Sequence, residues 1–192
     1  MNQTQIKDPA MSCLLMQMAR AANILTAEGQ QELTERESIA EIVEGDGEPS
    51  YEFVTEVVEI CSTIARLDLA SLWEVVIFSW VVGCNEMDMN SIALHSPNRG
   101  VCSLAPIQRL SSSLGRGDET ALTINGKRKG ITRRDILKAM ISSGVKERTL
   151  NLIVKALEAA KPRWAELIAE SQITPEQRVA LKDLIDRRLA LL

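Results

Sequence analysis

One segment constrains this chain more than any other. The stretch RLDLASLWEVVIFSWVVG (66–83) predicts a helix that begins near Asp68 or Ser71 and ends at Gly83. Its apolar residues lie almost all around the helix rather than along one stripe, so protein must surround it. Its most apolar part, residues 75–84, is about half as long as a membrane span requires. The sequence therefore predicts a central, buried helix on which the other elements pack.

The composition is that of a soluble globular protein. The chain has 192 residues, of which 45% are hydrophobic and 25% charged, enough for one domain or two small subdomains. Aromatic residues are only 3%, so aliphatic side chains and methionine must fill the core. The net charge of -4 provides no general attraction to nucleic acid or to anionic membranes.

The remaining pattern is mostly helical. Apolar residues recur at helical spacing in residues 11–28 and 33–43, followed by the breaker EGDGEPS (44–50), whose Ser50 can cap the next helix. Further helices are predicted in the second half: RDILKAMISSG up to Gly144, residues 146–170 with Pro162 as a kink or break, and a last helix from Thr174.

A small β element is expected near the middle. ALTI (121–124) is a short β-like run, and Asn125-Gly126 after it is typical of a tight turn with positive φ. Thr132 and Asp135 then have the spacing of a capping box. The predicted fold class is mainly α, a helical domain with a few short strands or a small hairpin.

The cysteines do not indicate a metal site. Cys13, Cys61, Cys84 and Cys102 form no CxxC pair, and His95 is the only histidine that could join them. We interpret them as reduced thiols, and His95 as an ordinary histidine rather than a catalytic base. The N-terminus lacks the basic region of a signal peptide, so we expect a cytoplasmic protein without a membrane segment.

A basic cluster follows the predicted turn: Lys127, Arg128, Lys129, Arg133 and Arg134. It could contact an acidic partner or nucleic acid, or it could be an exposed hairpin tip followed by a helix start. No aromatic stacking platform adjoins it, and we do not expect direct nucleic-acid binding.

Several landmarks fall in a distinctive order: SYEFVTEVV, LWEVVIFSWVVG, CNEMDMNSIALH, SLAPIQRL, LTINGKRKGITRRDIL and AAKPRWAELIAE. This order resembles the C-terminal lobe of the HipA-like serine/threonine kinases, the toxin kinases of bacterial toxin–antitoxin systems. The resemblance covers roughly residues 49–170. It implies two parts, a helical N-terminal segment (1–48) and a kinase C-lobe domain (49–192).

The resemblance also implies site positions in the loop after the buried helix. In that family, a catalytic Asp accepts the proton of the attacking hydroxyl, and an Asn five residues later helps to hold magnesium. Here the catalytic position falls on Glu86, and Asp88 takes the place of a family His. The Asn position falls on Ser91, with Asn90 one residue early.

The second metal-binding Asp follows the Pro of an LAP motif by three residues, which in this chain is Arg109. A permanent cation there would repel magnesium. Glu86 in place of Asp would also move its carboxylate by about one ångström, enough to damage aligned chemistry. We therefore expect degenerate motifs. If the fold brings them together as in the family, a salt bridge of Arg109 with Glu86 or Asp88 could replace the metal, which we state as a hypothesis.

Two functions remain open. The first is a pseudokinase-like C-lobe without enzymatic activity or cofactor, linked to a toxin–antitoxin system and acting through contacts with itself, an antitoxin-like protein or a separate N-lobe. The second is a split or residual kinase that uses ATP and magnesium. Its N-lobe would come from another chain, because residues 1–48 lack the Gly-rich loop and the ATP-contacting Lys of an N-lobe. Glu86 would then accept the proton, with Asp88, Asn90 and Ser91 around the metal.

Two structural alternatives accompany these functions. The polar residues of the loop could form a weak metal site, or they could simply cap nearby backbone groups in a solvated turn. The whole chain could also be a stable remnant of a truncated gene.

Overall fold

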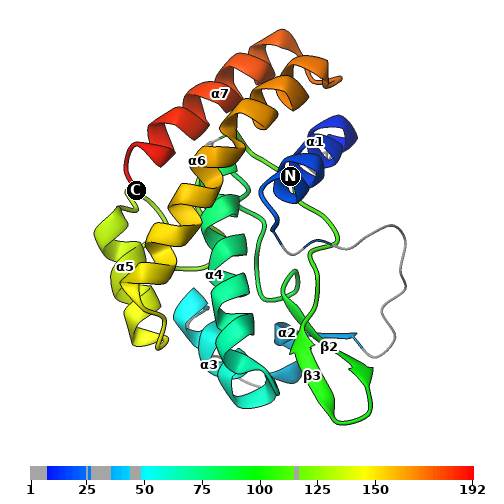
Figure 1. Cartoon of the computed structure of the whole chain (residues 1–192), viewed down its shortest axis with the longest axis vertical. Coiled ribbons are helices and arrows are strands. Elements are labelled where there is room, and N and C mark those ends of the chain that lie inside the picture. The colour runs from blue at the N-terminus through cyan, green and yellow to red at the C-terminus, as the bar shows by residue number, and fades with distance from the viewer. Residues whose placement is uncertain (1–7, 25, 27–35, 44–48, 115–116) are drawn as a thin grey trace, which may run out of the picture.

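The computed structural model describes residues 8–24, 26, 36–43, 49–114 and 117–192. It is mainly helical with one small sheet, which confirms the predicted fold class (Figure 1). In chain order the elements are α1 (Pro9–Ala21), β1 (Arg36–Ser38), α2 (Ile39–Ile42), α3 (Tyr51–Cys61), α4 (Ala65–Val82), β2 (Ala93–Asn98), β3 (Val101–Leu104), α5 (Arg133–Ser142), α6 (Glu147–Glu170) and α7 (Pro175–Leu189).

Helix α4 is the predicted central helix. It contacts α3, α6, α7 and β3, and residues 75–82 are all buried (Figure 1). Gly83 ends it with φ 75°, a left-handed conformation in which glycine carries no steric penalty. The helix begins earlier than predicted, at Ala65. Asp68 lies in its first turn, where its carboxylate accepts bonds from the Ser62 hydroxyl at 2.6 Å and the Leu104 amide at 2.8 Å.

The sheet is antiparallel in the order β1-β2-β3, and its strands were not predicted in these places. Residues 36–43 form β1 and the short α2 rather than one helix, because Arg36 pairs with His95 and Ser38 caps α2 in a box with Glu41. ALTI forms only isolated bridges at Thr123 and Ile124. Residues 44–48 of the predicted breaker (44–50) and residues 27–35 lie outside the described residues.

Local predictions in the second half are confirmed. Asn125 and Gly126 have φ angles of 49° and 74° and form the tight turn, and Thr132 caps α5 in a box with Asp135. Thr174 begins α7 with a capping box as well. Helix α6 continues through Pro162, so the predicted alternative of a break there is wrong.

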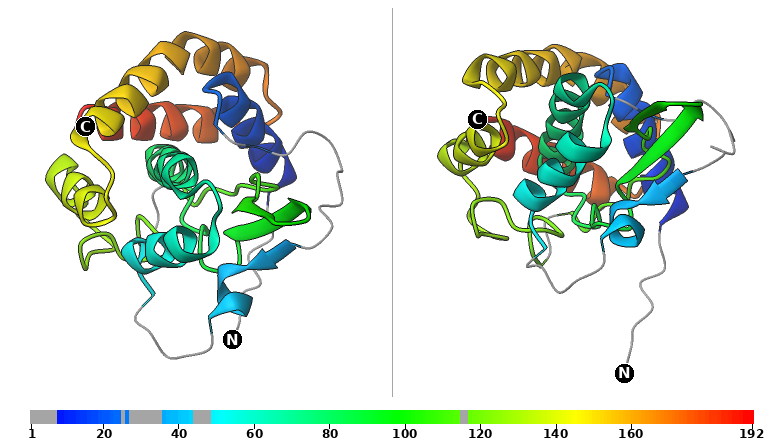
Figure 2. Two further views of the ribbon diagram at one scale, coloured as in Figure 1. Left: turned by 60° about the horizontal axis from the view of Figure 1, so that its bottom comes forward. Right: turned by 90° about the horizontal axis from the view of Figure 1, so that it is seen from below.

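Helix α1 belongs to the same apolar core as the rest of the chain. It packs on α6, and its Met18 carbonyl accepts a hydrogen bond from Nε1 of Trp164 at 2.8 Å (Figure 2). It spans less than the predicted 11–28, since the chain turns at Asn23 with φ 58°. The boundary between 48 and 49 remains a prediction. None of the described helices is long and apolar enough to span a bilayer.

Candidate functional site

A cavity of about 720 Å³ lies between the loop after α4, strand β1 and the segment after β3. The sequence-predicted residues Glu86, Asp88, Asn90, Ser91 and Arg109 all line it. Its other lining residues are Arg36, Asn85, Gln108 and Ala121. The structure therefore brings together every site residue that the sequence implied.

The loop after α4 is a tight polar turn centred on Asp88. One carboxylate oxygen of Asp88 accepts the backbone amides of Asn90 at 3.1 Å and Ser91 at 2.9 Å, and the Ser91 hydroxyl lies 2.9 Å away. The other oxygen accepts Nδ2 of Asn90 at 3.3 Å. These contacts are those of the backbone-capping alternative, and a metal-binding role of the three residues stays a prediction.

The turn is held firmly by its surroundings. The Tyr51 hydroxyl on α3 donates to the Met87 carbonyl at 2.8 Å, and burial raises the pKa of Tyr51 far above its ordinary range. The Ser112 hydroxyl lies 2.9 Å from the carbonyl of Val82, and Nδ2 of Asn85 donates to the Asp118 carbonyl at 3.2 Å. Burial also raises the pKa of the Cys84 thiol, so this cysteine packs as an unreactive neutral group.

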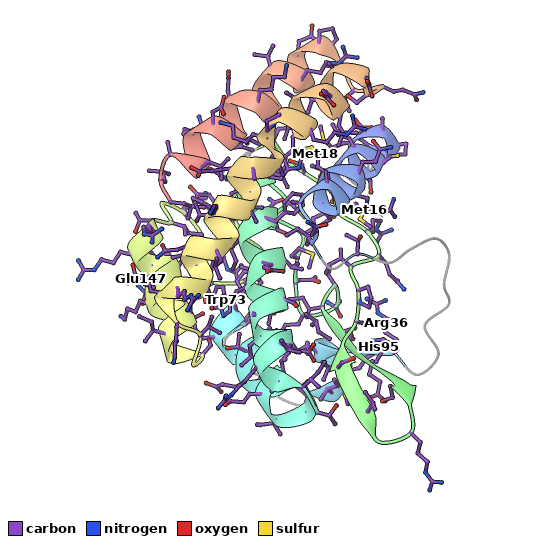
Figure 3. The ribbon with its side chains drawn as sticks, in the orientation of Figure 1. Met16, Met18, Arg36, Trp73, His95 and Glu147 are labelled. Carbon is purple, nitrogen blue, oxygen red and sulfur yellow. The ribbon has the colours of Figure 1, made fainter. Side chains whose placement is uncertain are left out.

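Arg36 is a lining residue that sequence reasoning missed. Its guanidinium donates to Oε1 of Gln108 at 2.9 Å and approaches the Ser91 carbonyl at 3.5 Å. Figure 3 shows Arg36 beside His95, its partner in the sheet register. No local pattern indicated this position, because Arg36 reaches the cavity only through the pairing of β1 with β2.

Arg109 is an exposed residue that lines the cavity. Among the described residues, no salt bridge pairs Arg109 with Glu86 or Asp88, so the hypothesised bridge in place of the metal is not found there. The turn donors already occupy both oxygens of Asp88. An exposed guanidinium also gains little from an ion pair, because water already solvates it.

Two features of the cavity oppose a magnesium ion. Magnesium requires oxygen ligands in octahedral geometry, usually with one or two carboxylates free to coordinate. Both oxygens of Asp88 are committed to the turn, and the guanidinium of Arg109 adds a repelling positive charge. Within the described ranges no three His, Cys, Asp or Glu side chains are grouped as metal ligands.

The other candidates lie elsewhere. His95, Cys61 and Cys102 line a second cavity of about 530 Å³ beside the sheet. Burial, with smaller contributions from Cys61 and Asp68, raises the pKa of the Cys102 thiol. The four cysteines form no disulfide.

Much of the basic cluster is neutralised within the molecule. Lys127 forms an ion pair with buried Asp135 at 2.8 Å, and Lys129 pairs with Asp118 at 3.3 Å. Arg133 donates to the carbonyl of Leu192 and lies 3.5 Å from Glu147. The cluster therefore includes structural contacts of α5 and of the turn before it.

The comparisons with known proteins support the fold alone. No family model matches the sequence, and no curated protein matches it. A solved structure of HipA from Shewanella oneidensis MR-1, a toxin–antitoxin complex of HipA, HipB and operator DNA, superimposes with a TM-score of 0.67 at 11% identity. The match covers 98% of this chain and 56% of the other, so this chain spans about half the length of that protein.

Proposed function

We propose that this chain is a HipA-like unit with a non-catalytic site, and that it acts through protein contacts in a toxin–antitoxin setting. The observation that carries the proposal is Arg109 in the same cavity as Glu86 and Asp88. Phosphoryl transfer depends on metal ions that neutralise the phosphates, and a guanidinium at the position of a metal carboxylate opposes this.

The proposed link to a toxin–antitoxin system is inferred from the fold. The matching HipA is seen in complex with HipB and operator DNA, so a partner of the same kind is the natural candidate for this chain. Exposed apolar side chains at the junction of α3 and α4, among them Ile60 at 83% and Leu67 at 67% exposure, also favour contact with another protein.

The proposal is tested by calorimetric titration with ATP, with and without magnesium, together with an assay for phosphate transfer to protein. We expect magnesium to leave the affinity for ATP unchanged and no phosphate to be transferred. Binding that magnesium strengthens, accompanied by transfer that Glu86→Ala abolishes, would overturn the proposal.

A split kinase is the second candidate, favoured by two observations. Glu86, Asp88, Asn90 and Ser91 meet in one cavity of about 720 Å³, and the chain spans only 56% of the matching protein. In this candidate, a separate chain would supply the N-lobe of the kinase. Mixing this chain with the product of a neighbouring reading frame that carries a Gly-rich loop and a Lys-bearing strand tests it, and transfer that only the mixture catalyses would favour it over the first proposal.

A further inference from the structure

Two of the four cysteines lie close together where α3 meets β3. Cys61 is the last residue of α3 and Cys102 lies on β3, and both line the cavity of about 530 Å³ beside the sheet. Both side chains are half-buried, so reagents in solution can reach them. Burial raises the pKa of the Cys102 thiol, and the next largest cause of the raised pKa is the charge of Cys61, a neighbouring sulfur that can also ionise.

Hydrogen bonds fix the backbone around this pair. The Thr63 amide donates to the Cys102 carbonyl at 2.8 Å, and the Cys102 amide donates to Oγ1 of Thr63 at 3.3 Å. The Asp68 carboxylate forms a second link, because it accepts from the Ser62 hydroxyl at 2.6 Å and from the Leu104 amide at 2.8 Å. The end of α3 and strand β3 are therefore held against each other without a covalent bond.

This arrangement favours a disulfide. A disulfide joins residues whose Cα atoms lie about 4.4–6.8 Å apart. Cys61 precedes Thr63 by two residues, a reach of at most about 7 Å, and the Thr63 backbone contacts Cys102 directly. The cavity that both cysteines line gives their side chains room to turn toward each other.

We propose that Cys61 and Cys102 form a reversible disulfide when the protein meets a small disulfide oxidant such as oxidised glutathione. The Cys61 thiolate attacks one sulfur of the oxidant and releases one thiol, which leaves a mixed disulfide on Cys61. Cys102 then gives up its proton to solvent, attacks the Cys61 sulfur and releases the second thiol. Two electrons thus pass from the protein to the oxidant, which is reduced to two thiols.

The order of the two attacks follows from the environment of the cysteines. The raised pKa of Cys102 keeps more of it in the thiol form, and the thiolate is the nucleophile. Cys102 is therefore the second to react, when the mixed disulfide on Cys61 is already beside it.

The bond would change the surface next to it. Ile60 and Val101 directly precede the two cysteines, and they are 83% and 37% exposed. A disulfide would fix α3 against β3 at these apolar residues. The inference does not depend on the proposed function, because it concerns only the oxidation of two thiols.

Oxidation of a Cys13→Ser chain tests the inference, because this variant lacks the exposed cysteine that could link two molecules. After incubation with oxidised glutathione, we expect the intact mass to fall by two hydrogen atoms and dithiothreitol to restore it. Trypsin cleaves between each of the remaining cysteines, so mass spectrometry of the peptides should identify Cys61 bonded to Cys102. The oxidised form should melt roughly 5–15 °C higher than the reduced form, because the bond closes a loop in the unfolded chain.

Cys61→Ser in the same background is the matched control. It should abolish both the loss of two hydrogen atoms and the rise in Tm. The inference fails if the mass of the Cys13→Ser chain does not fall, if glutathione stays attached to Cys61 or Cys102, or if Cys84 replaces either of them in the bond. Comparison of the oxidised and reduced Cys13→Ser chain decides the matter even where Cys61→Ser disturbs the fold.

Discussion

At the scale of single residues, the positive charge of Arg109 opposes magnesium binding in the cavity. Arg109→Asp removes a positive charge from the cavity and adds a carboxylate that the polar turn does not engage. We expect the variant to gain magnesium binding. At about ten times its Kd, magnesium would stabilise the variant by roughly 1.4 kcal/mol and raise its Tm by about 3–6 °C.

Thermal melts with and without magnesium measure this shift. Arg109→Gln is the control, because it removes the charge without adding a ligand. An equal response of the two variants, or none in Arg109→Asp, would contradict the importance of Arg109 in excluding the ion.

Asp135 is a second residue with a defined effect. Its buried carboxylate accepts hydrogen bonds from Asn125, Lys127 and Thr132. Burial alone would raise its pKa, but these bonds together lower it well below the ordinary value of 3.8. A lowered pKa means that the carboxylate stabilises the fold above about pH 4 and loses this contribution as the pH falls.

We therefore expect Asp135→Asn to lower the free energy of unfolding by roughly 1–3 kcal/mol at pH 7. The gap between the variant and the natural protein should narrow in acid. Urea titrations at pH 7 and pH 3 measure it, and a gap that stays constant with pH would show that the ionised carboxylate is not the source.

The residues that line the cavity could be predicted from the sequence only in part; their functional roles stay predictions. Glu86, Asp88, Asn90, Ser91 and Arg109 could be predicted because four are close in the chain and the motif spacing fixes the fifth. Arg36 could not be predicted, because it reaches the cavity through strand pairing with His95, which is distant in the sequence.

At the scale of elements, structures that depend on nearby residues were predicted, and those that depend on distant partners were missed. The caps at Thr132 and Thr174 and the Asn125-Gly126 turn depend on interactions within three residues, and each was predicted correctly. Strand β1 depends on distant partners, and its stretch was predicted as helix instead. Local chemistry can be inferred from a sequence, whereas sheet pairing requires the tertiary fold.

Helix capping gives a prediction at this scale. Thr132→Ala removes one hydroxyl that makes two hydrogen bonds. It accepts from the Asp135 amide and donates to the Asp135 carboxylate at 2.7 Å. We expect a loss of stability of about 1–2 kcal/mol. Thr174→Ala, at an exposed cap of α7, should cost less, because its Gln177 partner carries no charge.

Chemical denaturation of the two variants side by side measures the difference. Equal losses would indicate that the buried carboxylate adds nothing to the cap of α5.

At the scale of the whole molecule, the two ends of the described chain depend on each other. Helix α1 buries Met11, Leu14, Leu15 and Met18, and Trp164 of α6 donates to its last turn. We expect a chain of residues 49–192 to lack a cooperative thermal transition, because removing α1 exposes the apolar face of α6.

Circular dichroism melts of this truncated chain measure whether its thermal transition is cooperative. The full chain is the control. A sharp transition in the truncated chain would instead support an independent domain from residue 49 onward.

The contact between Met18 and Trp164 also affects how the protein is made. The two residues lie 146 positions apart, so α1 leaves the ribosome long before α6 exists. The apolar face of α1 must stay without its partner during most of synthesis, and closing so long a loop slows the final docking step. The nascent chain should therefore depend on chaperones until the C-terminal helices emerge.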